Sequence, residues 1–535
     1  MPPVAPGLPP PLPGPAVSPN AGPNLAISKV IFAGVTAYPE ADLRAIAGDL
    51  TGAAVPAGRI EDARRAILDL YRRDGYVYTA VSAQISNGEL TFVASEGYIA
   101  EIKLDGDQGP FANQVLRFLN HLLDARPLKT TVLERWLLLT SDIPGVSVRS
   151  TLRRSTGDPG ALTLVATLTR KAVSALLSAD NRAYQYTGPE EGLAVVDFNS
   201  FSEFGERTEL AFFHSLDNST QIFGQGSFET FLGGSGLKLR LYGGAGNDVP
   251  TGPLANQGYF GFTTIFGTQF SYPLIRERQQ TLNISAYFDA IQSKIDTNTG
   301  PNNAAVPYSY DSLRILRLSA DYVWFDTWAG DNHSATNAAS LKLSQGLHAL
   351  GATTTEGNEA ARVGERTDLF KINFDLARTQ ALCNPWANAT ISLRGALSGQ
   401  YSPDILPPSE EYFLGGAHFN RGYYAGQVTG DSAVTGTIEL LLDTPLPAPG
   451  AIPFNPTAQF YLFYDAGQAW DNQPAQKNVT LRSVGIGIRF YPTGTAQYEF
   501  DLEGAQRLNL FPNGSGPSIS ALPGQAVYWQ VLARF

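Results

Sequence analysis

One short stretch, FLGGAHFNRGYYAGQ at residues 413–427, concentrates residue types suited to a specific ion pair. It holds a single full charge, Arg421, among glycines and aromatic residues, and no carboxylate lies within the stretch to balance it. A guanidinium is a planar fork of donors that matches a carboxylate. An arginine in a surface loop is usually just solvated. Exposing so apolar a stretch to water would be unfavourable, however, and we therefore predict that the loop at 402–431 folds inward.

The best candidate partner for Arg421 is Asp465, in the segment AQFYLFYDAGQ at 458–468. Successive side chains of a strand point to opposite faces, so Asp465 lies on the face opposite the apolar Leu462 and Tyr464. Gly467 lies on the same face as Asp465 and leaves room for another piece of chain to approach. The residues alone leave an alternative open, in which Asp465 is one acidic residue among many on that face, such as Asp289, Asp375 and Glu499.

Other chemistry finds little support in the sequence. We find no phosphate-binding loop, no nucleophile elbow and no zinc helix. The five histidines are scattered and Cys383 is the only cysteine, so we expect no metal, no cofactor and no enzymatic activity. A net charge of -11 argues against a nucleic-acid partner. The hexapeptide GGAGND at 243–248 matches one calcium-binding repeat, but a single copy favours a hairpin turn.

The elements that would position Arg421 and Asp465 begin after a proline-rich segment. Residues 1–24 are predicted to be a flexible leader, because proline at that density blocks helix and sheet. Residues 25–96 and 97–170 each predict the order strand, helix, helix, strand, strand. We therefore expect two small α/β domains in tandem.

From 171 to 535 the helical period disappears and strands alternate apolar with polar residues. Charged residues make up only 16% of the chain, and no window is apolar for long enough to form a transmembrane helix. Strands of about ten residues suit a tilted crossing of a bilayer, and aromatic residues gather near their ends. The predicted fold is a membrane β-barrel of about 16 antiparallel strands, with the α/β domains on the side where its first strand begins. An extracellular all-β protein is the alternative that alternation alone leaves open.

The last strand, VYWQVLARF, places Trp529 and Phe535 on one face and ends the chain on an aromatic residue. Such an ending resembles the targeting signal of bacterial outer-membrane barrels. The alternative is an ordinary edge strand.

Together, the tandem modules, the barrel, RGY at Arg421, Gly422 and Tyr423 and FYDAG at 463–467 resemble the two-partner secretion transporters. These belong to the barrel-assembly superfamily, and their α/β modules are POTRA domains. In this family an inward loop carries an Arg-Gly-aromatic tip that docks on a Phe-x-Asp-x-Gly strand. The resemblance assigns the tip to Arg421, Gly422 and Tyr423, and the inner wall to Phe463, Asp465 and Gly467. Two features depart from the family: Asn420 replaces an aliphatic residue, and the proline-rich start cannot form the usual plugging helix.

The resemblance implies an outer-membrane transporter that binds an unfolded, β-rich exoprotein in the periplasm and secretes it through the barrel pore. Its other expected partners are outer-membrane lipid and the barrel-assembly machinery that inserts it, and we expect a monomer. The alternatives are a factor that inserts other barrels and a passive porin. A porin would need neither the α/β modules nor an inward arginine.

Overall fold

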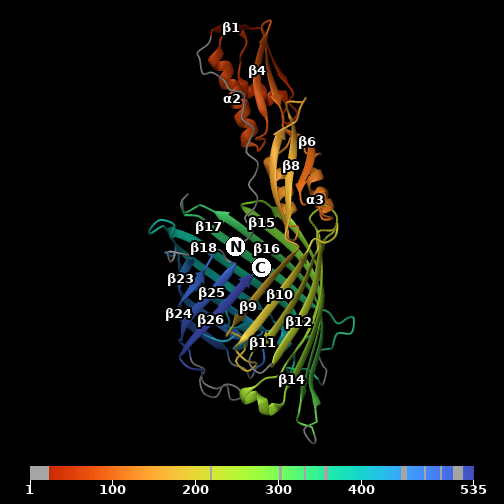
Figure 1. The fold of residues 1–535 in the computed structure, drawn as a ribbon, viewed down its shortest axis with the longest axis vertical. Helices are drawn as coiled ribbons and strands as arrows, with labels where there is room; N and C mark the ends of the chain where they lie inside the picture. Colours follow the sequence, from red (N-terminus) through yellow and green to blue (C-terminus); the bar gives the residue numbers. More distant parts are fainter. Residues whose placement is uncertain are drawn as a thin grey trace.

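The computed structural model describes residues 23–216, 220–300, 304–330, 333–354, 359–447, 455–474, 478–493, 497–509 and 522–535. Most of the predicted leader, residues 1–22, therefore lies outside the described residues. A closed barrel of sixteen strands carries two small α/β units stacked at one end (Figure 1). No helix in the described part of the chain is both long and apolar enough to cross a membrane.

The first α/β unit contains the predicted elements and one additional ribbon. Its sheet has the order β2-β5-β4, and β1 pairs with β3 in a separate two-stranded sheet that the sequence did not predict. Helix α1 ends where Gly48 takes a positive φ of 70°. The elements are β1 (Asn24–Ile27), β2 (Lys29–Ala33), α1 (Glu40–Ala47), β3 (Gly52–Pro56), α2 (Ala57–Arg73), β4 (Ala80–Ser86) and β5 (Glu89–Ser95).

The second unit repeats the arrangement, with the sheet order β6-β8-β7 and its two helices packed over one apolar core. Strand β7 pairs only with β8 and is an edge of that sheet. The elements are β6 (Tyr98–Gly106), α3 (Ala112–Leu119), the 3-10 turn η1 (Asn120–Leu122), α4 (Thr130–Ser141), β7 (Val146–Arg154) and β8 (Ala161–Arg170).

The barrel closes by pairing its first strand, β9, with its last, β26, and all its pairings are antiparallel. Sixteen strands, as the alternating pattern predicted, make up this closed sheet. They are β9 (Val173–Asp180), β10 (Glu191–Asn199), β11 (Arg207–Ser215), β12 (Gln221–Phe231), β13 (Lys238–Asp248), β14 (Phe260–Arg276), β15 (Gln280–Thr297), β16 (Val306–Asp326), β17 (Ala335–Gly346), β18 (Phe370–Cys383), β19 (Thr390–Tyr401), β22 (Ser432–Pro445), β23 (Thr457–Trp470), β24 (Val479–Tyr491), β25 (Tyr498–Arg507) and β26 (Gln525–Arg534).

Strand β23 shows how the alternating pattern sorts side chains between the two faces of the wall. Leu462 and Tyr464 are 49% and 43% exposed on the outside, whereas Phe463 and Asp465 are 1% and 0% exposed. The polar face therefore lines the interior and the apolar face forms the outer surface, as expected of a barrel in lipid.

The prediction of a hairpin turn at GGAGND is wrong, because residues 243–248 lie inside strand β13. A Cβ atom on Gly244 or Gly246 would lie within 3.0 Å of the Phe223 side chain, at 2.9 and 2.6 Å respectively. These glycines therefore leave space for an aromatic ring on the neighbouring strand β12.

The second α/β unit packs directly on the near rim of the barrel. Phe118 of α3 meets Phe231 of β12 edge to face, with ring centroids 5.0 Å apart. Arg276 of β14 donates two hydrogen bonds to the carboxylate of Asp142, at 2.7 and 2.8 Å. Such a bidentate pair fixes direction as well as distance, so this unit has a defined orientation against the barrel.

We predict that Asp142→Asn loosens this junction without unfolding either part. The fork of Arg276 would lose its charged partner, while the contact between Phe118 and Phe231 would remain. Spin labels on the second unit and on the barrel rim should then give a broader distribution of distances. Asp124→Asn, at an exposed position of the same unit, is the control and should leave the distribution unchanged. An unchanged distribution in Asp142→Asn would show that the other contacts of the junction, such as Arg135 with the carbonyl of Pro273 and Phe118 with Phe231, suffice to set the orientation.

Candidate functional site

The loop between β19 and β22, residues 402–431, enters the barrel from the end opposite the α/β units. Because β19 is the eleventh strand, the connection that follows it lies at the far end. Within the loop, β20 (Tyr412–Leu414) and β21 (Val428–Gly430) pair as a short ribbon that carries the 413–427 stretch. Leu414 and Tyr423 are 0% and 1% exposed, so the apolar part of the loop is buried in the barrel.

The structure brings Arg421 and Asp465 together. Arg421 donates to the carboxylate of Asp465 from Nε at 3.0 Å and from Nη2 at 2.9 Å. Its backbone N–H donates to the same carboxylate at 2.8 Å. The two side chains are 2% and 0% exposed. Three bonds to one buried carboxylate hold both the side chain and the backbone of the tip.

The sequence reasoning missed a second carboxylate in this site. Glu439 of β22 accepts a hydrogen bond from Nη1 of Arg421, and it also pairs with Arg394 at 2.6 Å. Thr437, two residues before it, accepts from Nη2 at 2.8 Å. The guanidinium carbon lies 3.7 Å from the centre of the Phe463 ring, a cation–π contact. The alternation of β22 could have placed Thr437 and Glu439 on the inner face.

The rest of the tip is held mainly by its backbone. The carbonyl of Gly422 accepts hydrogen bonds from Arg507 of β25 and from the Tyr528 hydroxyl of β26, the latter at 3.0 Å. A Cβ atom on Gly422 would lie 2.7 Å from the Cβ of Ser483, so only glycine fits against β24 there. The Tyr423 ring packs in an apolar cluster with Leu414 and Leu481. The predicted tip residues therefore lie against the inner wall.

Asn420 fits its position for a reason that the sequence did not reveal. Its φ is 52°, a left-handed conformation that asparagine tolerates and β-branched residues do not. Its side chain donates to the carbonyl of Leu481 at 3.1 Å and accepts from Thr435 at 2.8 Å. A Cβ atom on Gly467 would lie 2.4 Å from the Asn420 side-chain oxygen. Asn420 and Gly467 therefore fit one another as a pair.

The first loop of the barrel, after β9, supports the tip from another side. Arg182 pairs with Glu503 at 3.0 Å and lies 4.3 Å from the centre of the Tyr528 ring. It also donates to the carbonyl of Arg421 at 3.4 Å. The tip is thus surrounded by residues from five strands and a second loop.

Of the two residues of the predicted targeting signal, Trp529 lies in β26 and Phe535 directly follows that strand. Phe535 exchanges backbone hydrogen bonds with Ala175 of β9, and its side chain is 49% exposed. Trp529 donates its backbone N–H to the Asn181 side chain at 2.9 Å. Both belong to the seam where the barrel closes, and their role in targeting stays a prediction.

The contacts of the tip are ion pairs, hydrogen bonds and aromatic packing. In the described part of the chain no three histidine, cysteine or acidic side chains are grouped to hold a metal. An arginine stays protonated at any physiological pH, so its two carboxylate partners determine the strength of the contact. These contacts hold the loop tip against the inner wall.

Comparisons with known proteins identify relatives of the whole fold. The family model for haemolysin secretion/activation proteins of the ShlB/FhaC/HecB type matches residues 163–490, and the model for ShlB-type POTRA domains matches residues 25–97. No curated protein matches the sequence.

Solved structures show the same architecture at low sequence identity. CdiB from Escherichia coli is 16% identical, with a TM-score of 0.73 over 97% of this chain and 92% of that one. CdiB from Acinetobacter baumannii is 16% identical, with a TM-score of 0.63 over 96% and 91%. BamA from Haemophilus ducreyi, lacking POTRA domains 1-3, is 13% identical, with a TM-score of 0.53 over 96% and 100%. At these identities the likeness shows the fold alone.

We predict that Gly467→Ala disturbs the tip by displacing Asn420. The added methyl would overlap the Asn420 oxygen, and overpacking of this kind costs about 1–3 kcal/mol. The free energy of unfolding, measured in urea with the barrel in lipid vesicles, should fall by about that amount. Gly504→Ala, where no heavy atom lies within 4 Å of the new Cβ, should leave it unchanged. Equal stability of the two variants would contradict the tight fit between Asn420 and Gly467.

Proposed function

The chain belongs to the family of haemolysin secretion/activation proteins, and we propose that its inward loop tip holds the secretion pore closed between transport events. It is an outer-membrane transporter of the two-partner secretion type, its partner is a secreted exoprotein, and its POTRA-like units lie in the periplasm. Roles for individual residues are the part that we propose.

The observation that carries the proposal is the buried pair of Arg421 and Asp465. An extended chain passing through the barrel needs the space that the loop occupies. Removing one partner of a buried ion pair costs about 3–5 kcal/mol, because the other charge is left uncompensated. The tip therefore has a defined docked position, and we propose that transport requires it to shift.

We propose that an unfolded, β-rich exoprotein is first bound at the edges of the POTRA-like sheets. Strand β7 is such an edge, and its exposed residues include Arg149 and Arg153. An extended segment can add to a sheet edge through backbone hydrogen bonds alone, which suits a client with no folded surface. Folding of the client outside would then remove the extended chain from the equilibrium and drive export.

The remaining expectations about this chain are part of the proposal. We infer that domain boundaries lie near residues 25, 97 and 171, and that the protein works as a monomer in lipid. We also infer that Trp529 and Phe535 help the barrel-assembly machinery to recognise the new chain. Loss of membrane insertion in Phe535→Ala, with insertion retained in Phe500→Ala on the same outer surface, would support the last point, and equal insertion would contradict it.

Two alternatives from the sequence are weaker. A factor that inserts other barrels has the same fold, and BamA is among the similar structures, but the family model is that of secretion proteins. A passive porin has no use for two POTRA-like units or for a tip fixed by a buried arginine.

Charge reversal tests the proposed role of the tip. Arg421→Asp would place three carboxylates together and leave the tip undocked in the lumen, where it would obstruct the client. We therefore expect secretion to be lost while the barrel still folds, as judged by its heat-modifiable migration. Adding Asp465→Arg should restore secretion only in part, because the new aspartate would still face Glu439. Adding Glu439→Gln to that pair should recover more. Unchanged secretion in Arg421→Asp alone would rule the role out.

The proposed client edge can be tested by binding. In Arg149→Glu combined with Arg153→Glu, the affinity of the full transporter for the amino-terminal segment of its exoprotein should fall, and the loss should shrink at high salt. Arg72→Glu, an exposed position on α2 of the first unit, is the matched control. Equal affinities for all three proteins would show that Arg149 and Arg153 take no part in client binding.

A further inference from the structure

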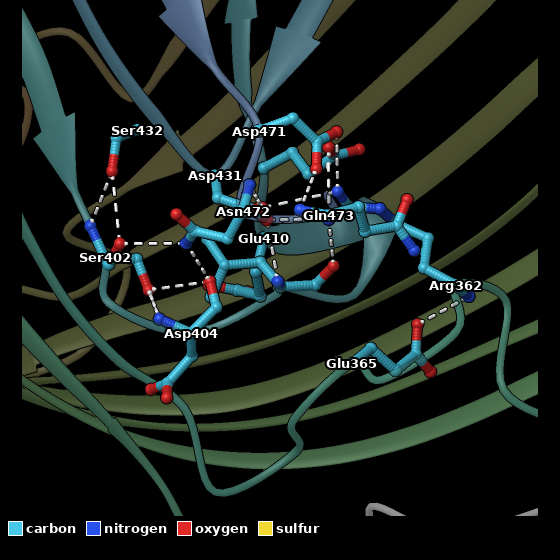
Figure 2. A network of polar contacts seen from close by, with 12 residues as sticks. Arg362, Glu365, Ser402, Asp404, Glu410, Asp431, Ser432, Asp471, Asn472 and Gln473 are labelled. Carbon is cyan, nitrogen blue, oxygen red and sulfur yellow. Dashed lines mark hydrogen bonds and ion pairs between the residues drawn. The ribbon is translucent and has the colours of Figure 1, made fainter. Parts of the chain in front are cut away.

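A second group of ion pairs holds the base of the inward loop, where it leaves β19 and returns to β22 (Figure 2). At the start of the loop lies the 3-10 turn η4 (Pro408–Glu410). The carboxylate of Glu410 accepts two hydrogen bonds from Arg317 of β16, at 2.8 and 3.0 Å, and pairs with Lys371 of β18 at 2.8 Å. Glu410 is 3% exposed. Arg317 and Lys371 of the barrel wall therefore hold the buried carboxylate of Glu410.

The end of the loop is held by a residue of a different surface loop. Arg362, in the connection between β17 and β18, pairs with Asp431 at 2.7 Å and with Asp471 at 2.8 Å. Asp431 is fully buried, and its carboxylate also accepts the backbone N–H of Leu406 at 2.7 Å. It thereby joins Leu406, near the start of the loop, and the last residue of the loop to one another and to Arg362.

A third carboxylate beside Arg362 is less able to carry charge. Glu411 lies 3.2 Å from Arg362. Burial raises the pKa of Glu411 to about 7, against the opposing effect of the nearby Arg362 guanidinium. At neutral pH the aspartates at 431 and 471 are therefore the main acidic partners of Arg362.

The base and the tip of the loop contact different parts of the barrel. The base contacts β16, β18 and the β17–β18 connection through Arg317, Lys371 and Arg362. The side chain of Arg421 at the tip contacts β22 and β23 through Glu439 and Asp465. The two groups of ion pairs share no residue, so breaking one leaves the other intact.

We propose that the ion pairs of Arg362 and Glu410 are a permanent anchor, about which the loop pivots inside the lumen when the tip is released. This inference rests on the proposed gating role of the tip and adds that releasing the tip does not release the loop. Arg362, Arg317 and Lys371 are positioning residues in this scheme. The loop stays attached to the rim during transport, and the tip can return to Asp465 after the client has passed.

Single-channel conductance in planar lipid bilayers tests the anchor on the full-length protein. Asp465→Asn should raise the conductance only slightly, because the anchored loop still occupies the lumen. Arg362→Gln should leave it near the wild-type value, because the tip is still docked. The combination of Asp465→Asn, Arg362→Gln and Glu410→Gln, which breaks both halves of the anchor, should conduct severalfold more than Asp465→Asn. A combined variant no more conductive than Asp465→Asn, or Arg362→Gln alone as conductive as the combination, would overturn the proposal.

Two further variants keep the result interpretable. Glu359→Gln changes an exposed position in the same connection as Arg362, and with Asp465→Asn it should not add to the conductance. Should Arg362→Gln fail to give a heat-modifiable barrel, Glu410→Gln with Lys371→Gln removes the other half of the anchor and leaves Arg317 paired with Asp289 at 2.7 Å. Secretion by Asp465→Asn is measured separately. Normal secretion by this variant would contradict the proposed role of the tip. The anchor proposal is tested by the conductance measurements and does not depend on the secretion result.

Discussion

The position of the loop tip depends on one buried guanidinium. Arg421 binds Asp465 through three hydrogen bonds and contacts Glu439, Thr437 and the ring of Phe463. A charge this deeply buried is stable only if its donors are matched. The barrel wall supplies that match on adjacent strands, so the geometry of β22 and β23 determines where the tip can rest. Everything else at the tip, including the tight contacts of Gly422 and Asn420, adjusts to that position.

Much of the fold could be predicted from periodicity. A strand with one face toward water and the other toward lipid must alternate polar and apolar residues. The same argument correctly placed Asp465 on the inner face. It did not identify Glu439, because Leu441 on the same face is also apolar and buried, packed beside Tyr461 in the lumen. A lumen that contains a packed loop also has apolar residues on the inner face of its wall. Hydropathy therefore does not fully separate the inner from the outer face of a strand.

Loops and close contacts could not be predicted in this way. Arg362 lies in a connection with no periodic pattern, and its partners are about 70 and 110 residues further along the chain. The glycines of GGAGND resembled a turn because glycine is common in turns, yet in β13 they make room for Phe223. Likewise, Asn420 departs from the family pattern but suits a left-handed backbone. Each of these residues is explained by a neighbour that only the folded chain brings close.

In a buried ion pair, the attraction between the charges is balanced against the hydration that they lose. This balance suits the proposed role of the tip, which is to hold the loop and then to release it. The attraction between Arg421 and its carboxylates is offset by the loss of their hydration, so the intact pair adds little net stability. If water enters the lumen as the tip moves, both charges regain their hydration together, and opening costs little. If one partner is removed by mutation, the other stays buried without compensation and the cost is large. An ionic contact at the tip can therefore be released readily, although removal of either partner by mutation destabilises it strongly. An apolar contact of the same area would not combine these two properties.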